Sequence, residues 1–146
     1  MAGRTEHSVE IARAPEEVFP WLFDEDKVPQ WTTGMKSYER LDSGELGEGA
    51  RYRQQLEVSG ERITVELEVI RYEPPRRAES RFQVRGIDVV NVYELAGADG
   101  TTTLTQSVEA SGGGLTGRFM IPVLQPHLER KLKADLAALA EVLQSR

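Results

Sequence analysis

The chain has 146 residues, a formal net charge of −6 and no cysteine. This length is typical of one domain with its own hydrophobic core, so we expect a single domain over residues 1–146. The absence of cysteine excludes disulfides, thiolate nucleophiles and cysteine-ligated metals. Basic residues are scattered among 24 acidic ones, which argues against a nucleic-acid partner. With no apolar signal segment or membrane-spanning run, we expect a cytoplasmic protein without an integral membrane segment.

The first thirty residues predict a strand followed by two short helices. Residues 7–11 alternate in the manner of a strand. Pro15 suits the first turn of a helix, whose apolar face would be Val18, Trp21 and Leu22. A second short helix is expected within residues 25–31.

From residue 36 onward, glycine-rich and proline-rich turn signals separate a succession of strands, which predicts an antiparallel meander. The clearest alternation is in residues 63–69, where apolar and polar side chains take opposite faces. Applied to each strand, the two-residue period gives a set of inward-facing residues: Tyr52, Gln54, Leu56 and Val58; Ile63, Val65, Leu67 and Val69; Ser80, Phe82 and Val84; Ile87, Val89, Asn91, Tyr93 and Leu95; Leu104, Gln106, Val108 and Ala110.

A long helix is predicted over residues 115–143, where apolar side chains recur at helical spacing. A helix of ~29 residues would span about 44 Å, which exceeds the width of a small sheet unless the sheet curls around it. Pro122 and Pro126 predict an irregular first half, and Gly112, Gly113 and Gly114 predict a hinge or a tight corner before it. We therefore expect a concave sheet around the helix, with a cavity between them.

Three segments carry a resemblance to a known family. Residues 11–22 resemble its opening Ala-Pro-x-x-Val-Phe helix, residues 28–31 its second helix, and residues 47–52 the glycine loop before its third strand. The chain thus resembles the polyketide cyclase/dehydratase and lipid-transport group of the SRPBCC (START/birch-pollen-allergen-like) superfamily. The resemblance implies an α+β helix-grip fold, in which a curved antiparallel sheet of about seven strands, two short helices near the N-terminus and one long C-terminal helix enclose a lipophilic cavity.

Polar residues on the predicted inner face are the first candidates for contacting a ligand. They are Tyr52, Gln54, Ser80, Asn91, Tyr93 and Gln106. A buried polar group without a partner costs roughly 1–3 kcal/mol, so these groups need a ligand, water or one another. A strand register shifted by one residue would instead place them outside.

Apolar side chains form the rest of the expected ligand-binding site, together with one histidine of the long helix. They are Trp31, Met35, Leu56, Val65, Leu67, Phe82, Val89, Phe119, Met120, Val123, Leu124 and His127. Apolar residues at helical spacing are also typical of ordinary core, and a helix histidine is commonly exposed to solvent.

Three functions remain open from the sequence. The first is binding or transport of a small hydrophobic molecule, such as a lipid, isoprenoid, polyketide or aromatic metabolite. The second, implied by the resemblance, is a cyclase or dehydratase in which Tyr52, Tyr93 or His127 transfers protons while Gln54 and Asn91 hold a carbonyl. The third is a protein-interaction module with a filled interior.

The predicted inner face contains no carboxylate, so His127 is its one group that titrates near neutral pH. We therefore assign no catalytic residue, and favour binding over catalysis. No motif for a zinc enzyme or a serine hydrolase is present, and we expect no metal or cofactor. The expected partner is a small hydrophobic ligand, and the expected assembly a monomer or homodimer.

Overall fold

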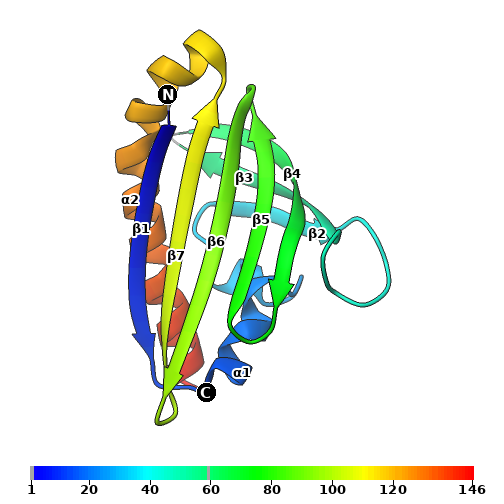
Figure 1. Ribbon diagram of the computed structural model, residues 1–146, viewed down its shortest axis with the longest axis vertical. Coiled ribbons are helices and arrows are strands. Elements are labelled where there is room, and N and C mark those ends of the chain that lie inside the picture. Colours follow the sequence, from blue (N-terminus) through cyan, green and yellow to red (C-terminus); the bar gives the residue numbers. More distant parts are fainter. Residues whose placement is uncertain (1, 59) are drawn as a thin grey trace.

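The computed structural model describes residues 2–58 and 60–146 and places seven strands in one antiparallel sheet. The elements in chain order are β1 (Ala2–Ile11), α1 (Pro15–Val18), the 3-10 helices η1 (Phe19–Leu22) and η2 (Val28–Gln30), β2 (Met35–Arg40), β3 (Arg51–Val58), β4 (Glu61–Glu73), β5 (Arg77–Val84), β6 (Ile87–Ala98), β7 (Thr101–Gly112) and α2 (Gly114–Gln144). The expected order of strand, short helices, meander and long helix is confirmed (Figure 1). The side chain of Val58 and all of Ser59 lie outside the described part.

The sheet has the order β1-β7-β6-β5-β4-β3-β2, so the first strand pairs with the last. β1 begins at Ala2, earlier than the alternation predicts, because it pairs with β7 over its whole length, from Ala2 opposite Ser111 to Ile11 opposite Thr102. α2 lies against β1 and β7. Strands β2–β4 curve away from this edge, which makes the sheet concave toward the helix (Figure 1).

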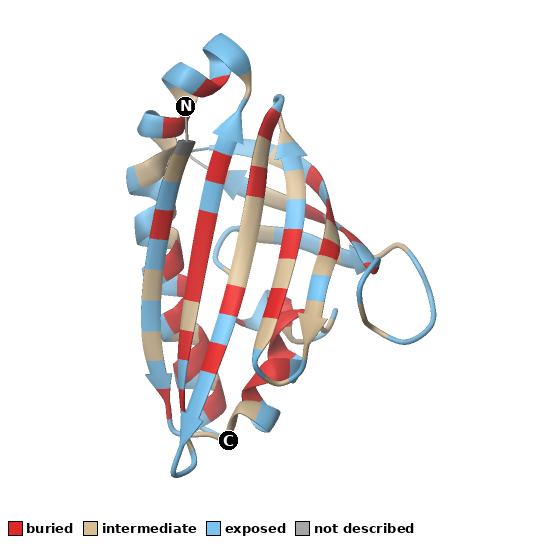
Figure 2. Cartoon of the chain, viewed as in Figure 1, coloured by how far each residue is buried: buried red, intermediate tan, exposed pale blue. Residues whose placement is uncertain are grey.

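The predicted inner faces follow the observed strand register. Tyr93 pairs with Gln106, and Ser80 pairs with Asn91. Figure 2 shows the resulting succession of buried and exposed residues along the strands. A β-bulge between Val69 and Arg71 changes the face on which the following residues lie, so Tyr72 also packs against the core.

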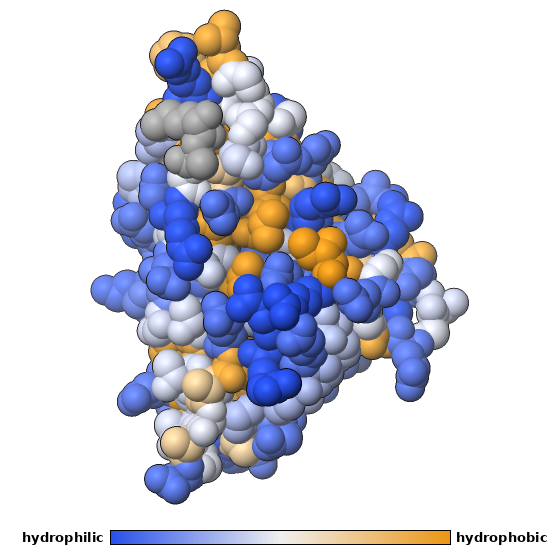
Figure 3. All heavy atoms as spheres, in the orientation of Figure 1, coloured by the Kyte–Doolittle hydropathy of each residue, from blue (hydrophilic) through white to orange (hydrophobic). Residues whose placement is uncertain are grey.

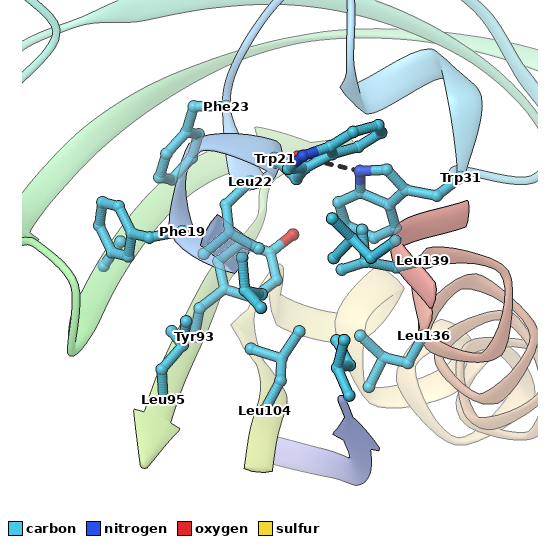
Figure 4. Close-up of a cluster of buried hydrophobic side chains, with 14 of the residues drawn as sticks. Phe19, Trp21, Leu22, Phe23, Trp31, Tyr93, Leu95, Leu104, Leu136 and Leu139 are labelled. Atoms are coloured by element: carbon cyan, nitrogen blue, oxygen red, sulfur yellow. Dashed lines mark hydrogen bonds between the residues drawn. The ribbon is translucent and has the colours of Figure 1, made fainter. Parts of the chain in front are cut away.

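Side chains of η1, the central strands and the second half of α2 form one hydrophobic cluster, which we call the packed end. Its members include Tyr52. Figure 4 shows ten others: Phe19, Trp21, Leu22, Phe23, Trp31, Tyr93, Leu95, Leu104, Leu136 and Leu139. Aromatic rings contact one another here, with 4.8 Å between the centroids of Tyr38 and Tyr52. The indole Nε1 of Trp31 donates a hydrogen bond to the carbonyl oxygen of Trp21 at 2.9 Å.

A smaller cluster joins α2, between Ile121 and Leu132, to the other end of β6 and β7, and we call it the open end. It contains Ile87, Val89, Val108, Ala110, Ile121 and Leu132. Between the two clusters α2 bridges the concave sheet.

The first half of α2 is more regular than the sequence predicts. The helix is continuous from Gly114 to Gln144 although Pro122 and Pro126 lie within it. Each proline removes one backbone hydrogen bond, and both lie on the exposed side, where water can bind the freed carbonyl groups. In the part of the chain that the structure describes, no helix is long and apolar enough to cross a bilayer.

The connection between β7 and α2 is a tight corner. Gly113 caps the helix with φ of 79°, and a Cβ there would lie 2.8 Å from the side chain of Ile87. A Cβ on Gly117 would collide with the carbonyl oxygen of Gly112. Glycine at these positions lets α2 begin directly against the end of the sheet.

Candidate functional site

A cavity of about 240 Å³ lies between the concave face of the sheet and α2. Nearly every element contributes to its wall, and most residues predicted for the site line it. These are Trp31, Met35, Gln54, Leu56, Val65, Leu67, Ser80, Phe82, Val89, Asn91, Tyr93, Gln106, Leu124 and His127. The fold thus brings these predicted side chains together around one cavity.

Four predicted residues do not line the cavity. Tyr52 faces inward, but its ring stacks on Tyr38 within the packed end. Phe119 and Val123, in the first turns of α2, are 71% and 61% exposed, whereas Ile121 is buried and Gln125 donates a hydrogen bond to the carbonyl oxygen of Arg4 in β1. Met120 packs against the open end. Apolar side chains are visible at the tip of the molecule where α2 begins, at the top of the view in Figure 3.

Sequence reasoning missed several other lining residues. Ile63, Val84, Ile87, Val108 and Ala110 lie on faces that the two-residue period placed inward, so a signal for them was present. Helical spacing from Leu124 likewise indicates Leu128 and Leu132. Leu22, on the predicted apolar face of the first short helix, also lines the cavity. No local pattern indicates the remaining lining residues Gly3, Thr5, Phe23, Val28, Thr32, Tyr38, Ile121 and Gln125.

A buried carboxylate corrects the expectation that the inner face has none. Asp135 of α2 is 4% exposed and lines the cavity. Its Oδ1 accepts hydrogen bonds from the backbone N–H of Thr33 at 2.8 Å and from the Thr33 hydroxyl at 2.7 Å. The ammonium of Lys131, one helical turn earlier, lies 2.9 Å from Oδ2 and donates to the carbonyl oxygen of Thr33 at 2.6 Å.

This Asp135 cluster (Thr33, Lys131 and Asp135) joins α2 to the segment between η2 and β2. Both carboxylate oxygens accept hydrogen bonds and the charge is paired with Lys131, as a buried charge requires. Trp31, Thr32 and Met35 flank Thr33 and line the cavity. The cluster therefore holds one wall of the cavity against the helix, and its carboxylate is not a free general base.

The side-chain amides of Asn91 in β6 and Gln106 in β7 form a hydrogen-bonded pair that leaves one acceptor without a partner among the described residues. The Nε2 of Gln106 donates to the Oδ1 of Asn91 at 2.8 Å and is 3.5 Å from the Tyr93 hydroxyl. Gln106 is 8% exposed, and among the described residues its Oε1 has no hydrogen-bond partner. An unsatisfied buried acceptor costs about 1–3 kcal/mol.

The tyrosines of the cavity wall are held in the neutral form. Burial raises the pKa of Tyr93 well above its usual value; the nearby Asp135 adds to this rise and Asn91 opposes it. Burial also raises the pKa of Tyr38, with a further rise from neighbouring Tyr52. Neutral phenols with raised pKa values are poor proton donors, so the wall favours holding a ligand over transferring protons to it.

His127 lies at the solvent-exposed rim of the cavity. Its Nδ1 is 2.9 Å from a guanidinium nitrogen of Arg130. Because arginine only donates hydrogen bonds, Nδ1 accepts, which places the proton of the neutral ring on Nε2.

A concave antiparallel sheet closed by one long helix over a mainly apolar cavity defines a class of domain suited to enclosing small molecules. The family assignment agrees with this class. Residues 2–144 match the family described as "Polyketide cyclase / dehydrase and lipid transport", and the chain belongs to that family.

Solved structures confirm the helix-grip fold. The aromatase/cyclase ZhuI from Streptomyces sp. R1128 has a TM-score of 0.83 at 20% identity, over 100% of this chain and 96% of that chain. Norcoclaurine synthase from Thalictrum flavum, in complex with dopamine and hydroxybenzaldehyde, has a TM-score of 0.74 at 12% identity, over 100% and 88%. Ara h 8.0201 has a TM-score of 0.74 at 16% identity, over 100% of both chains. No curated protein matches the sequence significantly.

Proposed function

We propose that this protein binds a small hydrophobic molecule in the cavity between the sheet and α2, as a binding or carrier protein. The observation that carries the proposal is the cavity itself, whose wall is mainly aliphatic and aromatic and includes Val65, Leu67, Val89 and Leu132. Pockets for small molecules have this composition, with a few polar groups that orient the ligand.

The size of the cavity supports a ligand of modest dimensions. An apolar cavity of about 150 Å³ is known to hold benzene. A volume of about 240 Å³ therefore suits a molecule of roughly two fused rings, or a flexible chain of similar bulk.

The chemistry of the wall favours binding over catalysis. The carboxylate of Asp135 is fully hydrogen-bonded, and the Tyr93 phenol has a raised pKa. His127 is at the rim, where its Nδ1 is engaged with Arg130. A general base needs a free lone pair within reach of the proton that it removes. None of these three groups presents such a lone pair inside the cavity.

A cyclase or dehydratase is the second candidate. It is favoured by the structural similarity to an aromatase/cyclase and by Asn91 and Tyr93, which lie together in the wall and could orient a carbonyl group. In this alternative the cavity would shape a reactive chain instead of carrying a finished product.

Native mass spectrometry of the purified protein tests the proposal. A retained small molecule, identified after denaturation, would support it and name the ligand class. If the protein stays free of ligand after incubation with a panel of lipids, polyketides and aromatic compounds, the proposal is wrong and an interaction module with no ligand becomes the better account. Turnover of a retained compound, lost on Asn91→Leu while its binding persists, would favour the enzyme.

A further inference from the structure

A band of polar side chains crosses the otherwise apolar wall of the cavity. Ser80 of β5 lies opposite Asn91 of β6, and Tyr93 of β6 lies opposite Gln106 of β7. The hydrogen bond between the Gln106 and Asn91 amides joins the two pairs diagonally. These four side chains, the polar band, lie on the three adjacent strands β5, β6 and β7, and all line the cavity.

The polar band has hydrogen-bonding capacity that the protein does not fill. The Oε1 of Gln106 is buried and unpartnered among the described residues, although buried amide oxygens are nearly always paired in native proteins. The last torsion of a glutamine side chain is soft, so a modest rotation turns this oxygen toward a donor that enters the cavity. The unfilled position therefore indicates a ligand with a hydrogen-bond donor.

The charges of the wall indicate that this ligand is neutral. Lys131 and Asp135 are the charged side chains among the lining residues that the structure describes, and they are paired with each other and bonded to Thr33. A buried carboxylate or phosphate on the ligand would find no free cation, and a buried anion without a partner is strongly disfavoured.

We propose that the polar band is a binding subsite for the hydroxyl group of a neutral, mainly apolar ligand, with Gln106 as the group that selects for the hydroxyl. A hydroxyl both donates and accepts, so it satisfies the Gln106 amide in either of its two orientations. This inference rests on the proposed function, because it assigns the chemistry of the ligand in that same cavity.

Three probes of equal ring size test the subsite: naphthol, methylnaphthalene and naphthoate, all substituted at the same ring position. Their dissociation constants are measured by calorimetry for the wild type, Gln106→Leu, Gln106→Met and Gln54→Leu. Gln54 is the matched control, because it is the other buried glutamine of the wall. The thermal midpoint of each variant is measured in parallel, and the two Gln106 variants together guard against failure of one to fold.

We expect the wild type to bind naphthol about tenfold more tightly than methylnaphthalene and to reject naphthoate. Both Gln106 variants are expected to lose the preference for naphthol and to retain methylnaphthalene, while Gln54→Leu keeps the preference. If the wild type binds naphthol and methylnaphthalene equally, or if Gln54→Leu alone removes the preference, the subsite is wrong and the cavity proposal stands. If the wild type binds none of the probes and no panel compound, both proposals are wrong.

Discussion

The two halves of α2 carry a similar repeat of leucines but meet different surroundings. In the second half, Leu136 and Leu139 are fully buried against η1 and the central strands. In the first half, Leu124 and Leu128 are half-buried and face the cavity, and Phe119 is exposed. The apolar period of the helix is thus the same along its length, and the difference lies in what the concave sheet holds beneath it.

The short N-terminal helices explain this difference. Phe19, Trp21 and Leu22 of η1 fill the concave face at the packed end, whereas in the described chain the first half of α2 has no comparable element beneath it (Figure 1). Packing is complete where these side chains reach and a void remains where they do not. We infer that the packed end supplies most of the stability, and the open end and cavity supply binding.

The largest effect is expected from alkaline pH, which acts on the packed end. All four tyrosines have raised pKa values with burial as the main cause: Tyr38, Tyr52 (to about 12), Tyr72 and Tyr93. Below about pH 10 both states hold neutral phenols, and stability is unaffected. Above about pH 10 the tyrosines of the unfolded chain ionise while those of the folded protein stay neutral. The free energy of unfolding therefore falls progressively as the pH rises toward the pKa values of the folded protein.

Urea denaturation across this pH range, with phenolate absorbance followed in parallel, measures the effect. Tyr52→Phe is expected to reduce the loss of stability per pH unit. Tyrosines that all ionise near about pH 10 in a fully folded protein would show that the packed end is open to water.

The next largest effect is expected from the matched pair Leu136→Ala and Leu124→Ala. The first creates a void in the packed end and is expected to lower the free energy of unfolding by about 2–5 kcal/mol. The second only enlarges an existing cavity, and the loss is expected to be about 1 kcal/mol. Equal losses in urea denaturation would contradict the division of α2 into two halves.

Asp135→Ala is expected to lower the free energy of unfolding by about 2–3 kcal/mol, because it leaves the two Thr33 donors without their acceptor and the Lys131 ammonium without its counter-ion. Thr33→Val removes one donor and is expected to cost about 1 kcal/mol. Because the cluster holds the cavity wall, both variants should weaken ligand binding. Hydrogen exchange of residues 31–35 checks this: unchanged protection in Asp135→Ala would show that the cluster does not hold the segment.

The smallest effect is expected at the tip of α2. Phe119→Ser should change the free energy of unfolding by less than about 0.5 kcal/mol, because the ring is already exposed. A matched substitution in the packed end, Phe19→Ser, should destabilise strongly. A loss for Phe119→Ser as large as that for Phe19→Ser would mean that the tip is packed in solution.

Much of this arrangement could be predicted from the sequence, because two periods govern it. The two-residue period placed Gln54, Asn91 and Gln106 on the inner face, and the helical period found α2. Neither period tells a side chain in the packed end from one that reaches the void. Tyr52 shows this limit: it faces inward as predicted, but its ring stacks on Tyr38, a partner that the alternation does not reveal.

The Asp135 cluster marks a second limit. Lys131 and Asp135 are four residues apart in a predicted helix, so their ion pair could be predicted from the sequence. Their burial depends on Thr33, which lies about a hundred residues earlier and meets them only through the fold. Similarly, Phe119 and Val123 fit the helical period, but the structure leaves both side chains exposed to solvent.

The most direct test of the account is an NMR titration of the backbone amides with methylnaphthalene. The account predicts chemical-shift changes that saturate at one equivalent of methylnaphthalene and are largest for residues lining the cavity, such as Val65, Val89 and Leu124. The changes around Leu139 in the packed end should be small. Val89→Phe, which fills the cavity, is expected to abolish the shifts while leaving the protein folded. Shifts that do not saturate, or that persist unchanged in Val89→Phe, would contradict the claim that this cavity is the binding site.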